Sequence, residues 1–529
     1  MVYCGKPSRA CENCRKLHVK CDERRPECSQ CMKMKRTCLG YRDQLSLVFR
    51  DENTKTQRRV RGAERNGGNL SPKKQPSMPI KQSNLPTTPP HDRHLHKTAG
   101  FGKNLLPPLE DSVVYHFYST ILASVLDGGP VRYLHSLLPD LYNQSAPHSP
   151  LRLAAQAISY ATSAKSRPDL ERISRLRYVQ AISALSAAIR DPNHAKDDQT
   201  LYAVLLLSGQ ETITCEVGTP LAYGTHIDGA ATLIRHRGME QLHEQLSSYL
   251  FHFVRRDLVL SHMQIAKPVD TIFYEHSEFI DQTQEDRLVE KIIDIPNLQS
   301  QANIVLGKST CPANDRSIFE LINASKILDS RISDWARNAL TTSSYTITTN
   351  VSMLSSTEAS VSDFSPPRIY RYSDIHLART WNIYRVSRLI VLSIIIRAVS
   401  RLDPTSIDAA HDLERLKAGG RQRELVNDIC ASVPFLLRHN VSRIAPPLVQ
   451  SRLKLDGKGD IVTKTGRYSL IWPLYVGSSV PSIPENQRRW MRAQLKWIGE
   501  SGKPQAKLLA SSNCQTLLGG TEKFRFYCA

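Results

Sequence analysis

The chain has 529 residues, a formal net charge of +20 and twelve cysteines. Residues 1–108 hold 23 Lys and Arg against 9 Asp and Glu, a net charge of +14, which leaves +6 for the other 421 residues. A basic end of this kind favours a phosphate-bearing partner. The opening Met-Val-Tyr-Cys-Gly-Lys-Pro has no apolar signal-peptide core, which argues against a secreted, disulfide-linked protein.

Six cysteines near the N-terminus form a repeated pattern, C-x2-C-x6-C-x6-C-x2-C-x6-C. A C-x2-C pair predicts zinc, because a gap of two residues lets one turn of chain offer two thiolates to one tetrahedral ion. Iron–sulfur clusters need tighter groups of cysteines. The predicted ligands are Cys11, Cys14, Cys21, Cys28, Cys31 and Cys38.

Six thiolates cannot close two separate four-coordinate sites, but they can close two sites that share two thiolates. The symmetry of the repeat predicts that the shared pair is Cys11 and Cys28, the first cysteine of each half. We therefore expect two Zn²⁺ ions, one held by Cys11, Cys14, Cys21 and Cys28, the other by Cys28, Cys31, Cys38 and Cys11. Two zinc ions and six thiolates carry a net charge of −2, which nearby Lys and Arg balance.

The residues inside this pattern resemble the fungal binuclear zinc-cluster transcription factors. The similarity runs through residues 10–22, continues as Pro-Glu-Cys-Ser-Gln-Cys from Pro26, and ends at Cys38. It implies two short helices, each opening at a C-x2-C pair and joined by a loop that turns at Pro26. It also implies that the first helix enters the major groove of double-stranded DNA.

Basic residues between the second and third cysteines are the candidate base-reading group. Lys16 and Lys20 are four residues apart, which predicts a shared helix face flanked by Arg15 and His18. In the resembling family this region commonly reads a CGG triplet. Here the Leu17 backbone carbonyl could accept a hydrogen bond from cytosine, and a ring nitrogen of His18 could donate a hydrogen bond to guanine.

Basic residues in the second half have a different expected role. Lys33, Lys35 and Arg36 are expected to contact phosphates, which position a protein on DNA without specifying sequence. Compensation of the cluster charge is the alternative role for Lys33 and Lys35.

The cluster is expected to occupy residues 9–40, and a basic, proline-rich, mostly disordered linker residues 41–108. Residues 71–108 hold eight prolines and few large apolar residues, too little to bury a core. Four arginines between Lys55 and Arg65 suggest a nuclear import signal, hence a nuclear location. Residues 39–70 carry no heptad pattern, which leaves a monomer or a homodimer formed through the larger domain.

Residues 109–529 are expected to form a large all-α regulatory domain. Within it, Leu389–Ile396 is apolar but short and bracketed by arginines, which indicates a buried core helix and not a membrane span. A mobile Ser/Thr-rich loop is expected near 341–366, and no strong period-two strand pattern is present. The predicted amphipathic helices are 111–126, 150–165, 170–190, 198–215, 222–237, 241–260 and 370–399, with further helices after 316.

Residues 209–215, 223–238 and 471–477 resemble the fungal transcription-factor regulatory domain. In the second stretch, Gly229 and Ala230 are expected to allow close helix approach, with Leu233 and Ile234 facing the core. Gly238 is expected to end that helix as a left-handed cap. His226 is expected to be a packing residue and not a ligand-binding one.

Enzyme signatures are missing from the sequence: His243-Glu244 begins like a zinc-protease motif, but the second histidine is replaced by Ser247. The predicted function is therefore sequence-specific, zinc-dependent DNA binding in RNA polymerase II transcription, with transcription machinery or coregulators as partners. The resemblance implies metabolic or secondary-metabolite target genes. The alternatives are a zinc-scaffolded protein-interaction module, or a corepressor, without its own sequence-specific DNA readout.

Overall fold

A computed structural model defines the fold. It describes residues 10–17, 19–22, 24, 27–34, 36–38, 109–124, 130–164, 166–214, 221–275, 282–308, 312–342, 345–348, 364–403, 409–437, 459–501 and 504–511. Residues 39–108, which include the predicted linker and import signal, lie outside this description.

The N-terminal module contains two one-turn helices, α1 (Glu12–Lys16) and α2 (Ser29–Lys33). Both begin just after the first cysteine of a C-x2-C pair, as the resemblance implied. The buried core of the module consists of Ala10 and four cysteines, with Val19, Cys21 and Cys38 packed against it. A core with so little apolar surface cannot stabilise a fold by itself, so metal binding and folding are coupled here.

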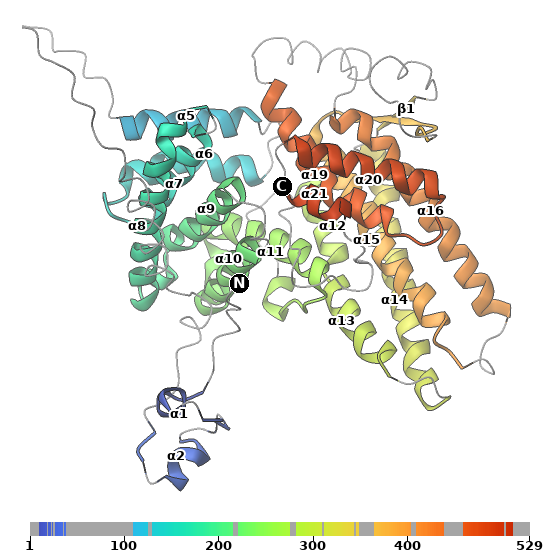
Figure 1. Cartoon of the computed structure of the whole chain (residues 1–529), viewed down its shortest axis with the longest axis horizontal. Coiled ribbons are helices and arrows are strands. Elements are labelled where there is room, and N and C mark those ends of the chain that lie inside the picture. Colours follow the sequence, from blue (N-terminus) through green and yellow to red (C-terminus); the bar gives the residue numbers. More distant parts are fainter. Residues whose placement is uncertain are drawn as a thin grey trace, which may run out of the picture.

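The second region is largely helical, as predicted, and is built around one large hydrophobic core, with a separate small cluster of Val113, Tyr160 and Leu170. In Figure 1, α5–α9 lie on one side and α14–α16 with α19–α21 on the other, with α11 between them. The helices of the first half are α5 (Leu109–Ser124), α6 (Pro130–Gln144), α7 (Pro150–Ser163), α8 (Glu171–Arg190), α9 (Asp198–Thr214), α10 (Leu221–Arg237) and α11 (Gln245–Ile265). Short 3₁₀ turns occur at Pro168–Leu170, His194–Lys196, Met239–His243 and Thr271–Tyr274.

The second half is organised around α15 (Ile375–Val399), which packs against α14, α16 and α19. Asp374 caps its N-terminus by accepting from the Leu377 N–H at 2.7 Å. The other helices are α12 (Gln284–Ile292), α13 (Ile295–Leu306), α14 (Pro312–Thr342), α16 (Ala409–Leu437), α19 (Gly459–Ser478), α20 (Glu485–Glu500) and α21 (Pro504–Ser511).

The apolar stretch Leu389–Ile396 lies inside α15, where seven of its eight residues are buried and Ile396 packs against the core, which confirms the prediction of a core helix. Among the described helices, none combines the length and the apolar character needed to cross a lipid bilayer.

A two-stranded antiparallel ribbon lies beside α16. Strand β1 (Thr346–Thr348) pairs with β2 (Ile369–Arg371), with Ile347 opposite Tyr370. Three residues of the predicted mobile loop at 341–366 therefore form a strand, while residues 349–363 lie outside the described part. Strands this short carry too little alternation to be recognised in the sequence.

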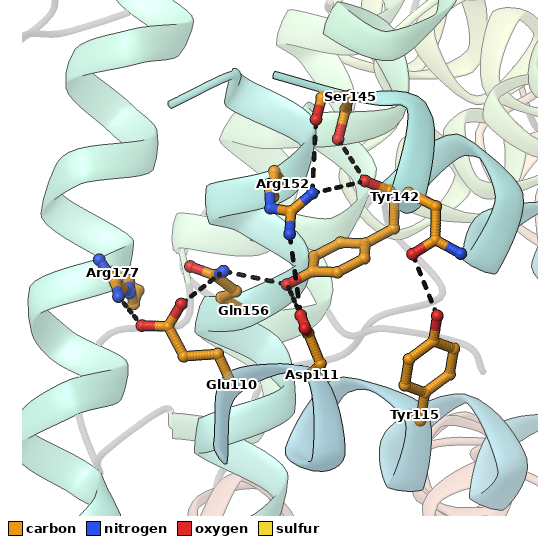
Figure 2. A network of polar contacts seen from close by, with 9 residues as sticks. Glu110, Asp111, Tyr115, Tyr142, Ser145, Arg152, Gln156 and Arg177 are labelled. Carbon is orange, nitrogen blue, oxygen red and sulfur yellow. Dashed lines mark hydrogen bonds and ion pairs between the residues drawn. The ribbon is translucent and has the colours of Figure 1, made fainter. Parts of the chain in front are cut away.

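The first turn of α5 is tied to three neighbouring helices by the polar network in Figure 2. Glu110 accepts a hydrogen bond from Gln156 of α7 at 3.3 Å and pairs with Arg177 of α8. The Tyr142 hydroxyl of α6 donates to Asp111 at 3.3 Å and accepts from Gln156 at 3.0 Å. These contacts fix the helix that follows the linker residues against the rest of the domain.

The six amphipathic helices predicted between 111 and 260 coincide with α5 and α7–α11, and α6 falls outside them. Ala230, Leu233 and Ile234 of α10 are fully buried, as expected. Gly238 does end α10 with a positive φ of 78°, but its ψ of −168° places it outside the left-handed helical region, which corrects the predicted cap.

Candidate metal centre and nucleic-acid interface

The six predicted cysteines meet in two overlapping groups of four. One group is Cys11, Cys14, Cys21 and Cys28, the other Cys11, Cys28, Cys31 and Cys38, and the thiols within each lie within 4.8 Å of one another. Cys11 and Cys28 belong to both groups, which is the sharing that the repeat symmetry predicts.

The sulfur spacing fits tetrahedral zinc. The Sγ atoms of Cys11 and Cys28, of Cys11 and Cys31, and of Cys14 and Cys28 are each 3.7 Å apart. Four sulfurs at about 2.3 Å from a tetrahedral zinc lie about 3.8 Å from one another. A disulfide would bring two sulfurs to about 2.05 Å, and all six cysteines are free. The donor set is therefore that of two Zn²⁺ ions sharing six thiolates.

Each helix start places a backbone N–H on a shared thiol. The Cys14 N–H donates to Cys11 Sγ at 3.5 Å, and the Cys31 N–H donates to Cys28 Sγ at 3.3 Å. The Cys31 N–H lowers the pKa of Cys28 to about 6, whereas burial raises the pKa of Cys31 to about 12 and also raises those of Cys11 and Cys14. Zinc must displace those protons, so its affinity depends on pH.

Two polar residues that the spacing did not single out join the halves of the module. The Asn13 side-chain amide donates to the Thr37 carbonyl at 2.8 Å and to Cys31 Sγ at 3.8 Å. The Asp22 carboxylate accepts from the Ser29 N–H at 3.0 Å and from its hydroxyl at 2.6 Å, at the first residue of α2. The hydroxyl contact is the main reason why the pKa of Asp22 is lowered. For Asp22, its position directly after the ligand Cys21 was the available sequence signal.

The structure corrects the predicted Lys16–Lys20 face. Helix α1 ends at Lys16, because the Val19 N–H turns back to the Cys14 carbonyl at 3.0 Å. Lys20 therefore lies beyond the helix, and the four-residue spacing does not place the two lysines on one helical face. Both are exposed, and Lys16 pairs with Glu12 at 2.8 Å.

The remaining predicted DNA contacts are only partly described. The Leu17 side chain is 45% exposed just after α1, and Lys33 is exposed at the end of α2. The Arg15 side chain, His18 and Lys35 lie outside the described part, as does Pro26.

His226 lies in the helical region and is held by packing partners. Its Nε2 is 2.8 Å from Glu211 Oε1 of α9, and Glu211 also accepts a hydrogen bond from Tyr178 of α8. This contact connects α10 to α9, which agrees with the packing role expected for the histidine.

Two family models match the chain. The Fungal Zn(2)-Cys(6) binuclear cluster domain matches residues 9–47, and the Fungal specific transcription factor domain matches residues 116–262, which run from α5 into α11. Neither family is an enzyme family. The stretch 471–477, which also resembles the regulatory domain, lies beyond the matched range.

Two curated proteins are similar to the chain. "Transcription factor dbaG" of Emericella nidulans is 24% identical over 395 residues, covering 72% of this chain and 86% of that protein. "White-opaque regulator 2" of Candida albicans is 48% identical over 46 residues, covering 9% of this chain and 10% of that protein. No solved structure matches the chain.

A six-cysteine cluster with zinc spacing, two fungal transcription-factor domains and extended similarity to a transcription factor all agree. The chain is a fungal zinc-cluster transcription factor.

Proposed function

We propose that the chain is a nuclear regulator that binds a short GC-rich triplet, of the CGG type, and controls RNA polymerase II transcription of metabolic or secondary-metabolite genes. The overlapping thiol groups carry this proposal, because they support a rigid two-zinc module that presents α1 to a DNA groove. All six cysteines act as metal ligands, with Cys11 and Cys28 bridging.

The DNA-contacting surface is formed by residues around the end of α1 and by α2. Lys16 and Lys20 are exposed on the first half, and Lys33 on the second. In this proposal Lys16 exchanges its contact with Glu12 for a phosphate, and Arg15, His18, the Leu17 carbonyl, Lys33 and Lys35 complete the interface. The net charge of +14 on residues 1–108 supports the proposal, since phosphate contacts draw affinity from released counterions.

A selection from a random duplex library with the zinc-loaded full chain tests the proposal. Enrichment of a CGG-type triplet, single or repeated at one spacing, is the expected result, and the spacing reports whether the protein binds as a monomer or a homodimer. Salt-sensitive binding without an enriched sequence would overturn it. Transcript profiling of a deletion strain tests the proposed target genes.

The exposed apolar side chains of the module favour a second candidate function. Met32 and Met34 are each 47% exposed. Leu17, which directly follows α1, is also exposed. Apolar groups displayed on so small a surface suit a protein partner. The second candidate is therefore a zinc-scaffolded interaction module or corepressor, which the same selection distinguishes by the lack of enrichment.

A further inference from the structure

Arg385 is an incompletely satisfied buried cation on α15. It is the largest fully buried side chain of the described region, with 1% of its surface exposed. Its Nη1 donates to the Tyr372 hydroxyl at 2.9 Å and to Asn382 Oδ1 at 2.8 Å, while its Nη2 has no hydrogen-bond partner. One donor edge of the guanidinium is therefore left without an acceptor, an arrangement that is costly in a protein interior.

Two other arginines of the same helix are paired with carboxylates. Arg388 contacts both oxygens of Asp329 at 2.7 and 2.8 Å, and Arg379 contacts Glu285 at 3.1 Å. Within the described residues, no carboxylate oxygen lies within 4.0 Å of the Arg385 guanidinium. The contrast sets Arg385 apart from arginines that serve only to hold helices together.

Aromatic rings surround this cation. Its Cζ lies 5.2 Å from the ring of Tyr370 on β2, 5.6 Å from that of Tyr345 just before β1, and 5.9 Å from that of Trp381 on α15. Burial raises the pKa of Tyr372 to about 12, and burial also raises the pKa of Tyr370, whose hydroxyl donates to Asp428. Both phenols stay neutral near pH 7. The Asp428 carboxylate interacts favourably with the charge of Arg385, but Nη2 still has no hydrogen-bond acceptor.

We infer that Arg385 anchors a binding site for a small planar carboxylate, which accepts from Nη2 and places its apolar part against the surrounding aromatic rings. A guanidinium matches the two oxygens of a carboxylate in a planar fork, and aromatic side chains bind the body of such a ligand. The inference adds a ligand to the helical domain and is independent of the proposed DNA recognition.

Benzoate is the probe, with benzamide as its uncharged control of the same shape. Both are titrated into the zinc-loaded full chain while thermal unfolding and tryptophan fluorescence are followed, since Trp381 lies beside Arg385. Benzoate is expected to raise Tm along a saturable curve and to change the fluorescence, while benzamide does neither at the same concentration. No effect of benzoate up to about 10 mM, a concentration that nearly saturates a site with millimolar Kd, would overturn the inference.

Arg385→Met removes the charge and keeps much of the volume. We expect it to fold and to weaken the response to benzoate at least tenfold. The matched control is Arg388→Met, which breaks a paired arginine on the same helix; it should lower the basal Tm and keep the benzoate response. Equal benzoate responses in the wild type and in Arg385→Met would contradict the assignment.

Asn382→Asp keeps the test decisive even if Arg385→Met does not fold. This isosteric change puts a carboxylate 2.8 Å from Arg385 Nη1 and so supplies the counter-charge from within the protein. It should raise the basal Tm and reduce the benzoate response. A lower Tm with an unchanged benzoate response would show that benzoate does not bind at Arg385 and would overturn the inference.

Discussion

The Asn13 side chain of the first zinc-binding half lies 3.8 Å from Cys31 Sγ of the second half. Its amide also donates to the Thr37 carbonyl at 2.8 Å, next to Cys38. One side chain on α1 thus positions two parts of the other half, and hydrogen bonds of this kind orient metal ligands.

Asn13→Ala should weaken zinc binding about tenfold, because loss of a hydrogen bond to a ligand typically lowers metal affinity by that factor or more. Competition with a chromophoric chelator measures the change. The neighbouring Glu12→Ala removes the exposed contact with Lys16 and serves as the control, with zinc affinity expected to be unchanged. Equal zinc affinity in Asn13→Ala and Glu12→Ala would rule out this role for Asn13.

Two substitutions near the end of α1 should separate general DNA affinity from base recognition. Lys20→Ala should weaken binding to every duplex and reduce the salt slope by about one charge. His18→Ala should lower the binding free energy for the cognate duplex by about 1–3 kcal/mol, through the loss of discrimination at a single base position. Fluorescence anisotropy on cognate and random duplexes measures the affinity of both variants. If His18→Ala loses the same affinity for both duplexes, this residue does not read a base.

His135 on α6 should make the helical domain less stable in mild acid. Burial, with a smaller effect of Arg256, lowers the pKa of His135 to about 4. In the unfolded chain the imidazole takes up its proton near pH 6.5, so stability is full above that pH and falls as pH decreases toward the folded pKa. Between pH 7 and pH 5, the free energy of unfolding of His135→Gln should therefore fall by about 2 kcal/mol less than that of the wild type.

Denaturant unfolding of both proteins at the two pH values measures this difference. Parallel losses of stability in the wild type and in His135→Gln would show that other groups carry the pH dependence.

Gly466 on α19 is required by close contact between helix backbones. A Cβ at this position would meet the Leu436 carbonyl oxygen of α16 at 2.2 Å. Gly466→Ala should destabilise the domain by about 1–3 kcal/mol, because the clash exceeds the gain of about 1 kcal/mol in helix propensity. The control is Gly419→Ala on α16, where a Cβ meets nothing within 4 Å and stability should rise by about 1 kcal/mol. Denaturant midpoints that rise for both variants would contradict the close approach.

The features that could be predicted from the sequence depend on short-range spacing. The sharing of Cys11 and Cys28 could be predicted because six thiolates are too few for two separate four-coordinate sites. Helices α7–α11 could be predicted from apolar periodicity. Helix α6 was missed because Pro139 lies inside it, and a proline normally marks a helix boundary.

The features that could not be predicted depend on contacts distant in sequence or on local chain reversal. The β1–β2 ribbon pairs Thr346 with Arg371, and the surroundings of Arg385 come from several elements. The prediction of a shared Lys16–Lys20 helix face was wrong because α1 ends after one turn, at Lys16, and helical spacing does not apply beyond it. Asn13 could be recognised as a ligand-orienting residue only once its distance to Cys31 was known.

The sharing of Cys11 and Cys28 makes the six cysteines unequal in their importance to the metal sites. Loss of either shared thiolate opens both coordination shells, whereas loss of Cys14, Cys21, Cys31 or Cys38 opens one shell and leaves the other zinc with four thiolates. Oxidation or alkylation of a single shared cysteine would therefore disrupt both metal sites at once.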